Sequence, residues 1–483
     1  MTSIPRIELA PGLNVPRIVV GLWQVADMER DGRTLDPERA ADALAAYADA
    51  GYDAFDMADH YGSAEIIAGR LLRRRPGSGT RAFTKWCPPP GPMTPEAVRA
   101  GINLSRQRLD VECLDLLQFH WWQYQHPGYL DALHELAVLK REGWAGQIGL
   151  TNFDTDHLRL LLEDGVPVVT NQVSFSLLDR RAAGRMSTLC SQRGVRLLAY
   201  GTLAGGFLTE RWVGADEPHH IADWSKSKYK RFVDAIGGWP ALQRVLAAAH
   251  AVARRHGVSV ANVAVRWVLQ QPAVGAVIVG ARPGEREHRD DNRAVFGFAL
   301  DADDLARLDD ALAGTTPLPG DCGDEYRRPP FLTASGDLSH HLAALPPVYP
   351  VHAAEGGRRR VDSGSLWEPL AGYCRALREG SRILVSGTTA THGAGRVVCP
   401  GDAEGQAVYI LDKIVAAIEA LGGRREHVVR TRVYVRNTYD WEDVALAHGE
   451  RFRHILPANT LVQAELVGEE YLVEVEAEAV VTS

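Results

Sequence analysis

The sequence predicts an α/β protein in which a (β/α)8 barrel is followed by a smaller α+β domain. The first observation is length, because 483 residues exceed what one ordinary hydrophobic core holds. The second is a repeated alternation of apolar, β-like runs with amphipathic helical stretches from residue 17 to residue 300. The third is a change of pattern after residue 362, where a different set of strands and two long helices begins.

Eight strand–helix pairs make up the first part of the chain. The predicted strands are nearly continuous apolar runs, as expected for parallel strands buried on both faces. Eight such units favour a closed barrel over an open sheet. In chain order, the pairs are 17–24 with 37–51, 54–58 with 63–74, 81–86 with 94–109, 115–121 with 128–143, 146–152 with 154–165, 166–175 with 179–194, 195–201 with 239–257, and 274–280 with a last helical stretch.

Four further segments belong to this first part. Residues 6–16 predict a small hairpin ahead of the first strand, and residues 261–270 predict one more helix ahead of the eighth. Residues 203–240 form a long loop after the seventh strand, and residues 313–345 form a second irregular segment. Long loops in barrels often shape the substrate site, so both are expected near it.

A linker is predicted over residues 346–361, which are rich in Pro, Gly and Arg. It divides a barrel domain, residues 1–345, from a compact α+β domain, residues 362–483. The second domain is expected to contain a strand over 381–390, a helix over 401–423, a strand over 428–437, a helix over 440–456, and strands over 459–467 and 471–481.

Composition excludes several classes of function. The net charge of -8 and the shortness of the basic runs at 70–75 and 357–360 give no reason to expect a nucleic acid partner. No apolar run reaches the roughly 18 residues that a membrane span needs, and the N-terminal residues lack a signal pattern. The six cysteines contain no CxxC pair, so reduced thiols in a cytoplasmic protein are expected.

A proton-transfer site is predicted where the second, third and fourth strands end. Asp56, Tyr61, Lys85 and His120 lie in or just after these strands, and active sites of barrels lie at such ends. Hydride transfer to a carbonyl leaves negative charge on its oxygen, so a proton donor must be close. A neighbouring ammonium on Lys85 would lower the pKa of Tyr61 from about 10 toward neutrality. Asp56 is expected to pair with Lys85, and His120 to orient the substrate oxygen.

Residues 1–343 resemble the aldo-keto reductase family. This resemblance implies reduction of an aldehyde or ketone by hydride transfer from NAD(P)H, or the reverse oxidation of an alcohol. It places the family's acid–base tetrad on Asp56, Tyr61, Lys85 and His120, with Tyr61 as the general acid/base. The matching pieces are DMADHYGSAE (56–65), TKW (84–86), DLLQFHW (115–121), GLTNF (149–153), NQVSFSLLDR (171–180), AYGTLAGGFLT (199–209) and VIVGAR (277–282).

The same resemblance implies a set of cofactor contacts. Beside Asp56, the matching positions are Gly21 and Trp23 after the first strand, Thr151, Asn152 and Gln172 for the carboxamide, Tyr200 for stacking on nicotinamide, and Gly280, Arg282 and Asn292 for the adenosine-phosphate end. Some family members carry an arginine four residues before the last of these, where this chain has His288. Arg282, Arg286 and Arg289 lie near enough in sequence to substitute, so NADP(H) is preferred over NAD(H).

The segment after the barrel contains residues of metal-ligating type, but no metal is expected. The candidate ligands are Asp321, Cys322, Asp324, Glu325, His340 and His341. The corresponding tail covers the substrate pocket in the family that the barrel resembles. Substrate selection or packing is therefore the preferred interpretation of this segment.

Residues 362–483 resemble the RidA/YjgF/UK114 family of imine and enamine deaminases. This implies a chorismate-mutase-like fold, a sheet with two helices on one face, and assembly into a homotrimer with clefts between subunits. The matching pieces are SLWEPLAGYCRA (365–376), ILVSGTTA (383–390), GDAEGQAVYILDKIVAAIEALGG (401–423), VVRTRVYV (428–435) and LVEVEAEA (472–479).

The second domain departs from the pattern of active deaminases at one position. Those enzymes use an arginine in a P-x-R-[ST] context to hold a carboxylate, whereas this chain has Asn459 there. Glu474, which matches the residue thought to position water, is retained, and His448 takes a nearby aromatic position. Trimerisation or binding of another ligand is therefore expected in place of deamination.

The leading prediction is an NAD(P)H-dependent oxidoreductase that interconverts a small carbonyl compound and its alcohol. One alternative is a nicotinamide-sensing or scaffold protein with little turnover. Another is a bifunctional reductase and imine or enamine deaminase, which the retained Glu474 keeps open. A homotrimer built through residues 362–483 is predicted.

Overall fold

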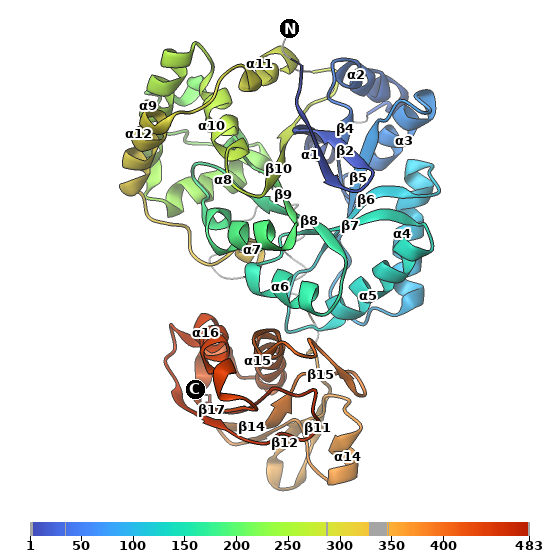
Figure 1. Ribbon diagram of the computed structural model, residues 1–483, viewed down its shortest axis with the longest axis vertical. Coiled ribbons are helices and arrows are strands. Elements are labelled where there is room, and N and C mark those ends of the chain that lie inside the picture. The colour runs from blue at the N-terminus through green and yellow to red at the C-terminus, as the bar shows by residue number, and fades with distance from the viewer. Residues whose placement is uncertain (1–2, 34, 286–287, 328–344, 346, 482–483) are drawn as a thin grey trace.

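The computed structural model describes residues 3–33, 35–285, 288–327, 345 and 347–481. Its barrel and its smaller second domain lie one above the other (Figure 1). Within the described residues, no helix is long and apolar enough to cross a membrane. The predicted architecture, a closed (β/α)8 barrel followed by an α+β domain, is confirmed.

Eight parallel strands close the barrel in the order β10, β3, β4, β5, β6, β7, β8, β9. The predicted hairpin precedes them as β1 (Arg6–Ala10) and β2 (Leu13–Pro16). The barrel strands are β3 (Ile18–Gly21), β4 (Ala54–Asp56), β5 (Arg81–Trp86), β6 (Leu114–His120), β7 (Ala145–Thr151), β8 (Val168–Ser174), β9 (Arg196–Tyr200) and β10 (Val274–Gly280).

The hairpin seals one end of the barrel. Leu9 and Leu13 are buried in one apolar cluster with Phe83 and Leu116 of the barrel strands. These apolar side chains exclude water from the amino-terminal end of the parallel strands. The polar side chains at the carboxyl ends are therefore the ones that can meet a ligand.

Thirteen α-helices accompany the barrel among the described residues. The first seven are α1 (Trp23–Arg30), α2 (Pro37–Asp49), α3 (Ala64–Arg74), α4 (Pro95–Leu109), α5 (Gly128–Arg141), α6 (Thr155–Glu163) and α7 (Arg185–Arg193). The other six are α8 (Trp224–Ala235), α9 (Gly238–His256), α10 (Val260–Leu269), α11 (Arg289–Ala294), α12 (Ala302–Ala313) and α13 (Asp324–Arg327).

The long loop predicted over 203–240 contains α8, which the sequence pattern did not reveal. Asp223 caps this helix by accepting a hydrogen bond from the backbone N–H of Lys226 at 2.9 Å. Its buried side chains include Tyr229 and Phe232, while most of its other residues are polar. The helix depends on tertiary packing more than on its own propensity, so its periodicity was too weak to detect.

The second domain is a seven-stranded sheet with order β11, β12, β13, β14, β19, β17, β18. These strands are β11 (Val351–Ala353), β12 (Arg359–Val361), β13 (Ala376–Glu379), β14 (Arg382–Thr389), β19 (Val473–Val480), β17 (Val428–Val435) and β18 (Ala458–Gln463). The short strands β15 (Thr391–His392) and β16 (Arg396–Val397) pair with each other. The helices are α14 (Trp367–Ala371), α15 (Ala403–Ala420) and α16 (Trp441–Phe452).

Residues 346–361, predicted as a linker, contribute β11 and β12 to this sheet. Each strand is only three residues long, and β11 is exposed along its whole length. Such strands lack the apolar alternation that marks a strand in sequence. β12 pairs with β13, and β11 pairs with β12; this pairing makes them strands, and it arises only when the sheet is assembled.

Helix α15 lies between its own sheet and helix α6 of the barrel (Figure 1). It is buried almost all round, as expected for a helix that packs on both sides. Ion pairs flank this contact, including Arg159 with Asp402 at 2.7 Å and Arg396 with Asp164 at 2.8 Å. The two domains therefore share a packed interface and are not joined by the chain alone.

Candidate active site

The barrel topology brings three of the four predicted catalytic residues to one cavity. Asp56 ends β4, Lys85 is the last residue but one of β5, and Tyr61 lies in the turn that follows β4. Lys85 Nζ is 2.6 Å from Asp56 Oδ2 and 4.9 Å from the ring centre of Tyr61. All three line a cavity of about 620 Å³ at the carboxyl ends of the strands.

Asp56 is held by donors from three strands. Its Oδ2 accepts from Lys85, and its Oδ1 accepts from Gln118 Nε2 and Gln172 Nε2, each at 2.8 Å. Lys85 also donates to the carbonyl oxygen of Met57 at 2.7 Å. This buried network fixes the ammonium group beside Tyr61 and leaves the carboxylate fully hydrogen-bonded.

Gln118 is a site residue that the sequence reasoning missed. It is fully buried, and its Oε1 accepts from Gln172 Nε2 at 2.7 Å. The available signal was a single amide side chain inside the apolar run LDLLQFH of the fourth barrel strand. A polar residue at such a position requires a partner, which here is the Asp56 carboxylate.

His120 ends β6 but lies beneath the cavity wall and does not line the cavity. The rings of Trp122 and Tyr326 lie 4.1 Å and 5.3 Å from its ring. Burial, and then the charge of Arg327, hold the pKa of His120 well below its usual range, so the imidazole is neutral. Tyr326 therefore stands between the histidine and the space available to a substrate.

The neutral ring of His120 has a defined role for each nitrogen. Its Nδ1 is 3.1 Å from the carbonyl oxygen of Thr151, which requires the proton to be on Nδ1. Its Nε2 is then an acceptor, and this buried atom has no hydrogen-bond partner among the described residues. In this tautomer, His120 can accept a hydrogen bond from an alcohol but cannot donate one to a carbonyl oxygen.

The residues expected to bind the cofactor gather around the same cavity. Two of its buried polar atoms, Thr151 Oγ1 and Gln24 Oε1, have no hydrogen-bond partner among the described residues, which leaves them available to a polar ligand. Tyr200 Oη is 2.8 Å from Asn152 Oδ1, and burial raises the pKa of this phenol well above its usual range. The predicted contacts that line the cavity are Gly21, Trp23, Asp56, Thr151, Asn152, Gln172, Tyr200, Gly280, Arg282 and Asn292.

The basic residues predicted to bind the phosphate end of the cofactor differ in their partners and in whether they line the cavity. Arg282 is already paired with Asp27 at 2.8 Å and Asp223 at 3.0 Å. Arg289 lies over the ring of Tyr47 on α2, at 5.3 Å. Arg286 falls outside the described residues. His288 lines the cavity.

Three cationic side chains from the 203–240 segment also line the cavity, and the sequence reasoning did not single them out. They are Arg211, Lys226 and Lys228. Lys228 is buried, and its Nζ donates to Tyr326 Oη at 2.7 Å. A loop whose fold is not predicted gives no indication of which of its cations turn inward.

The segment after the barrel folds onto the barrel mouth through α13. Glu325 is fully buried and pairs with Arg181 at 2.9 Å, while its Oε1 accepts from Tyr200 Oη at 3.1 Å. Asp321 accepts from the backbone N–H of Thr155 at 3.0 Å, across 166 residues of sequence. These side chains of metal-ligating type are engaged in protein contacts, whereas His340 and His341 lie outside the described residues.

One other group in the described part of the chain has metal-ligand spacing, namely Asp59, His60 and Cys87 beside Tyr61. Asp59 Oδ1 is 2.9 Å from His60 Nδ1, and its Oδ2 accepts from the backbone N–H of Cys87 at 3.0 Å. Burial raises the pKa of the Cys87 thiol well above its usual range, which disfavours the thiolate that a metal would need. These contacts hold the strand ends that carry the site.

The three residues singled out in the second domain do not meet within one chain. His448 on α16 and Asn459 on β18 both contact Thr431 Oγ1 at 2.9 Å, on the helix-covered face of the sheet. Glu474 pairs with Tyr434, three residues along β17 from Thr431, so its side chain projects from the opposite face. Burial, and then the charge of Glu476, raise the pKa of Glu474 above its usual range.

Comparison with known proteins agrees with the two-part architecture. Residues 17–313 match the family model described as "Aldo/keto reductase family", and residues 365–481 match the one described as "Endoribonuclease L-PSP". Among curated relatives, Aldo-keto reductase YhdN of Bacillus subtilis is 26% identical over 341 residues, covering 66% of this chain and 96% of the relative.

One more curated relative and one solved structure are also similar to this chain. The NADH-specific methylglyoxal reductase of Escherichia coli is 24% identical over 305 residues, covering 57% of this chain and 88% of the relative. The solved structure of a glycerol dehydrogenase from Gluconobacter oxydans is 25% identical with a TM-score of 0.53, covering 66% of this chain and 97% of that chain. With the family match spanning more than half of the sequence, the chain belongs to the aldo-keto reductase family of NAD(P)H-dependent oxidoreductases and carries a RidA/L-PSP domain at its C-terminal end.

Proposed function

We propose that the barrel interconverts an aldehyde or ketone and its alcohol, with Tyr61 as the general acid and base. The observation that carries this proposal is the ammonium group of Lys85, fixed by Asp56 at 2.6 Å and placed 4.9 Å from the ring centre of Tyr61. A fixed positive charge favours a phenolate over a phenol. Tyr61 can then donate a proton to a substrate oxygen as negative charge develops there, and take it back in the reverse direction.

A nicotinamide cofactor supplies the hydride when it is bound. Asn152, Gln172 and Tyr200 would hold its reactive ring, and the unpartnered Thr151 Oγ1 supports a polar ligand at this end of the cavity. Tyr200 and Trp23 provide flat apolar walls that exclude water from the reacting centre. The cavity of about 620 Å³ has room for a ligand of this class.

NADP(H) is our preferred cofactor over NAD(H). Arg211, Lys226 and Arg282 line the cavity beyond the reacting centre, and cationic side chains favour an additional phosphate. The name of the Escherichia coli relative records NADH specificity for that protein, so the preference must be measured. The ratio of kcat/KM with NADPH to that with NADH decides it, and a ratio below one would reverse the assignment.

The variant Tyr61→Phe tests the proposed acid–base role. We expect carbonyl reduction, followed by loss of NADPH absorbance across a panel of aldehydes and ketones, to fall by about 10²-fold or more. Cofactor binding, followed by fluorescence titration, should remain because the phenyl ring is kept. Near-wild-type turnover in this variant would exclude Tyr61, and binding without turnover by the wild type would favour a sensor or scaffold.

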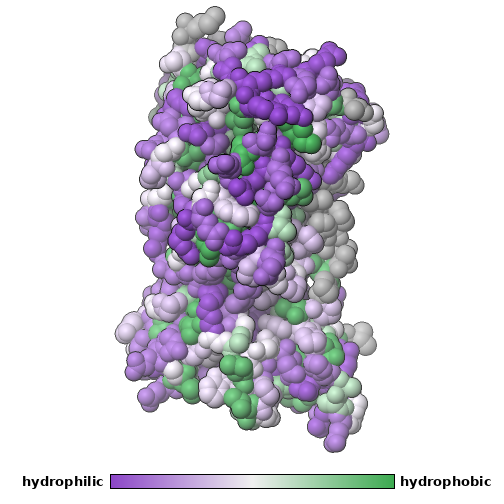
Figure 2. Space-filling view, turned by 90° about the vertical axis from the view of Figure 1, so that its right-hand side faces the viewer, coloured by the Kyte–Doolittle hydropathy of each residue, from purple (hydrophilic) through white to green (hydrophobic). Residues whose placement is uncertain are grey.

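For the second domain, we propose trimerisation as its main role. Apart from Ile66 and Leu104, the exposed large apolar side chains among the described residues lie at Val351 or beyond it. Figure 2 shows the corresponding concentration of hydrophobic surface at the lower end of the molecule. Exposed apolar surface of this kind marks an association site.

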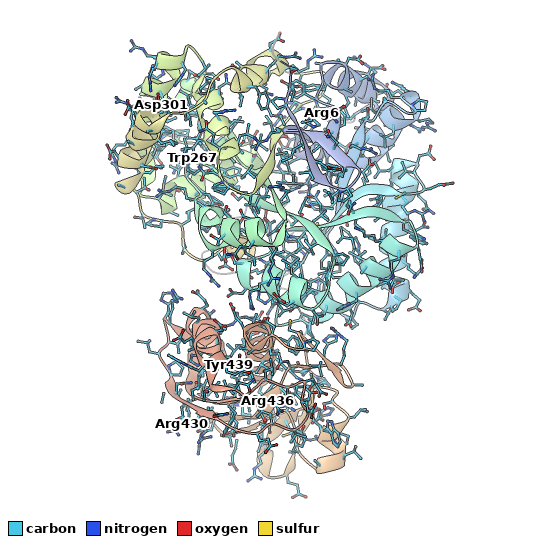
Figure 3. All side chains as sticks on the ribbon, viewed as in Figure 1. Arg6, Trp267, Asp301, Arg430, Arg436 and Tyr439 are labelled. Carbon is cyan, nitrogen blue, oxygen red and sulfur yellow. The ribbon has the colours of Figure 1, made fainter. Side chains whose placement is uncertain are left out.

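The face of the sheet turned away from α15 is available for this association. It carries the exposed Leu384 and Val462 between charged side chains such as Arg432 and Glu476, which are 2.8 Å apart. Arg430 projects from the same sheet on the side of the domain away from the barrel (Figure 3). Glu474 lies on this face too, so any imine chemistry would need groups supplied by a neighbouring subunit, since Asn459 lies on the other face.

Light scattering of the full chain tests the trimer. We expect a mass of three times 52.8 kDa for the wild type. The double variant Leu384→Glu, Val462→Glu should be monomeric, whereas Leu104→Glu on the exposed barrel surface serves as the matched control and should remain trimeric. A wild-type monomer with an intact second domain would refute the proposal.

A further inference from the structure

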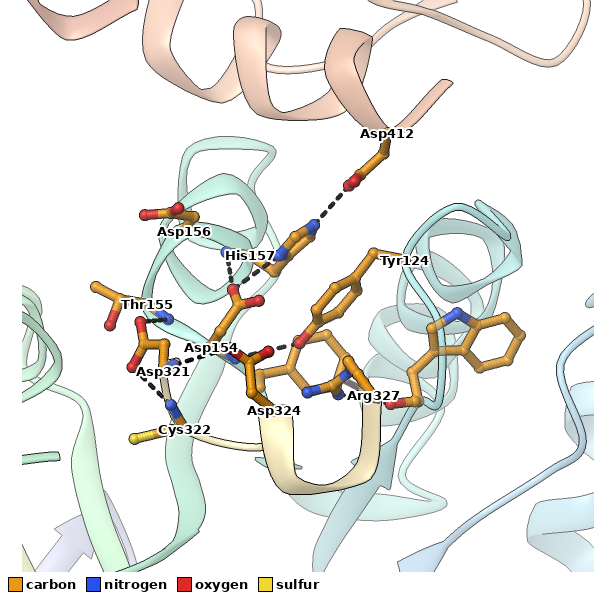
Figure 4. Close-up of polar contacts among 12 residues, drawn as sticks. Tyr124, Asp154, Thr155, Asp156, His157, Asp321, Cys322, Asp324, Arg327 and Asp412 are labelled. Atoms are coloured by element: carbon orange, nitrogen blue, oxygen red, sulfur yellow. Dashed lines mark hydrogen bonds and ion pairs between the residues drawn. The ribbon is translucent and has the colours of Figure 1, made fainter. Parts of the chain in front are cut away.

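A chain of buried contacts runs from the second domain to the wall of the barrel site (Figure 4). Where the two domains meet, His157 on α6 lies between two carboxylates. His157 Nδ1 donates to Asp154 Oδ1 and Nε2 donates to Asp412 Oδ2, each at 2.7 Å, and all three side chains are buried. Asp154 belongs to the barrel and Asp412 to α15, so a single imidazole joins the two domains.

The next contact in this chain is the ring of Tyr124. It stacks on His157 with the ring centres 3.3 Å apart and an angle of 8° between the planes. The guanidinium of Arg327 lies 4.2 Å from the centre of the same ring. Since His157 covers one face of Tyr124, Arg327 occupies the other, and the three groups form one stack (Figure 4).

Tyr124 is itself fixed within this stack. Its Oη accepts a hydrogen bond from the backbone N–H of Asp154 at 3.1 Å. The same Asp154 side chain caps α6 through the backbone N–H of His157 at 2.8 Å. The stack is therefore anchored to the start of α6, so a shift of His157 displaces Tyr124 and Arg327.

Arg327 connects this stack to the cavity. Its Nη1 donates to the carbonyl oxygen of Asn152 and its Nη2 to that of Trp121, both at 2.6 Å. Asn152 lines the cavity and Trp121 directly follows His120. The neighbouring residue on α13 is Tyr326, whose ring lies 5.3 Å from that of His120 and lines the cavity.

Burial makes these contacts hard to replace by water. Asp154, His157 and Asp412 are buried, and α13 is packed so closely that a Cβ at Gly323 would overlap the carbonyl oxygen of Asn152. Groups held this way have few alternative positions. A cavity of about 590 Å³ between the domains touches Asp154 and His157, but Asp412, Tyr124 and Arg327 do not line it. A change at Asp412 is therefore passed on mainly along the stack.

We propose that the second domain is a positioning part of the reductase site, in which Asp412 acts through His157, Tyr124 and Arg327 to fix Tyr326 and Asn152 in the cavity wall. None of the first four residues lines the cavity, so all are positioning residues. This proposal rests on the proposed reductase function, because one of its two readouts is the kinetics of carbonyl reduction.

The interface offers a matched control for this proposal. Asp402 also joins α15 to α6, through Arg159 at 2.7 Å, but it has no contact with the stack. Asp412 additionally pairs with Arg451, so its replacement leaves two cations without their shared partner. Asp402→Asn loosens a partly exposed ion pair and keeps a side-chain oxygen that can cap the start of α15 through the backbone N–H of Gly405. A general weakening of the interface would affect both variants, while the proposed route affects only one.

The experiment compares Asp412→Asn, Asp412→Glu and Asp402→Asn in the full chain. The first readout is amide hydrogen exchange of residues 321–327 without cofactor. We expect exchange there to rise by about threefold to tenfold in Asp412→Asn, to return toward wild type in Asp412→Glu, and to stay unchanged in Asp402→Asn. The second readout is steady-state kinetics, where KM for the carbonyl substrate should rise by a similar factor with kcat within about twofold.

The outcomes separate this proposal from the proposed function. Unchanged exchange at residues 321–327 in Asp412→Asn overturns the positioning role, whatever the activity. Raised exchange in a protein whose Tyr61→Phe variant is fully active keeps the positioning role and rejects the acid–base assignment. If Asp412→Asn does not fold, Arg327→Lys breaks the same stack from the barrel side, and unchanged exchange there is equally decisive.

Discussion

The charge on His157 should make the stability of the protein depend on pH between about 6.5 and 9. Burial opposes a charge on this imidazole, but Asp154 and Asp412 outweigh that effect and raise its pKa to about 9. A free histidine has a pKa of about 6.5. Because the folded-state value is the higher one, the stabilisation is complete below pH 6.5 and is lost as pH rises through 9.

The size of this effect follows from the two pKa values. Their difference of about 2.5 corresponds to about 3 kcal/mol of unfolding free energy, at about 1.4 kcal/mol for each pKa unit. On the same helix as Asp412, burial moves the pKa values of Lys413 and Glu419 to about 7, and their titration is common to the two proteins compared below. Asp154 has its pKa lowered by His157 and Arg327 against the effect of burial, and burial raises the pKa of Tyr124 well above its usual range. Arg451 on α16 keeps its charge throughout.

Urea unfolding of the wild type and of His157→Gln at pH 6 and pH 9.5 measures this effect. Glutamine keeps hydrogen-bonding capacity but cannot carry the charge. We expect the stability difference between the two proteins to shrink by about 3 kcal/mol from pH 6 to pH 9.5. Groups that titrate elsewhere cancel in this difference. A difference that stays constant across the pH range would refute the charged imidazole between the domains.

Three further predictions concern the barrel. Lys85→Met leaves the Asp56 carboxylate buried with amide donors alone. Turnover should therefore fall by about 10²-fold or more, and urea unfolding should show a loss of about 3–5 kcal/mol in stability. Leu104→Met, on the surface, is the control. Glu325→Gln removes one of the two carboxylates that pair with Arg181 and leaves Asp179 as its partner. The KM for the carbonyl substrate should rise, while the free energy of unfolding falls by about 1–3 kcal/mol. An unchanged KM would show that α13 does not shape the substrate site. Gly323→Ala places a Cβ against Asn152 at a backbone φ of 82°, so thermal unfolding should show destabilisation above about 1 kcal/mol, whereas Gly143→Ala, with a similar φ but open space, should cost less.

Much of the barrel could be read from local patterns. Continuous apolar runs marked the parallel strands, and the carboxyl ends of parallel strands must meet at one rim, so the sequence alone placed Asp56 and Lys85 together. His120 was placed at the same rim, but its cover by Tyr326 depends on α13, whose position no local pattern reveals. Helix α8 and strands β11 and β12 were missed because each is stabilised by tertiary partners.

The sequence by itself determined the two fold classes, the strand ends that carry the proton-transfer residues, and the absence of the usual arginine at Asn459, since each depends on residues close together in the chain. Only the tertiary structure decided that Gln118 holds Asp56, and that His157 and Asp412 meet across 255 residues of sequence. The physical reason is the range of the interactions. Periodicity acts over a few residues, whereas a buried charge is stabilised by whichever partners the folded chain brings within hydrogen-bonding distance.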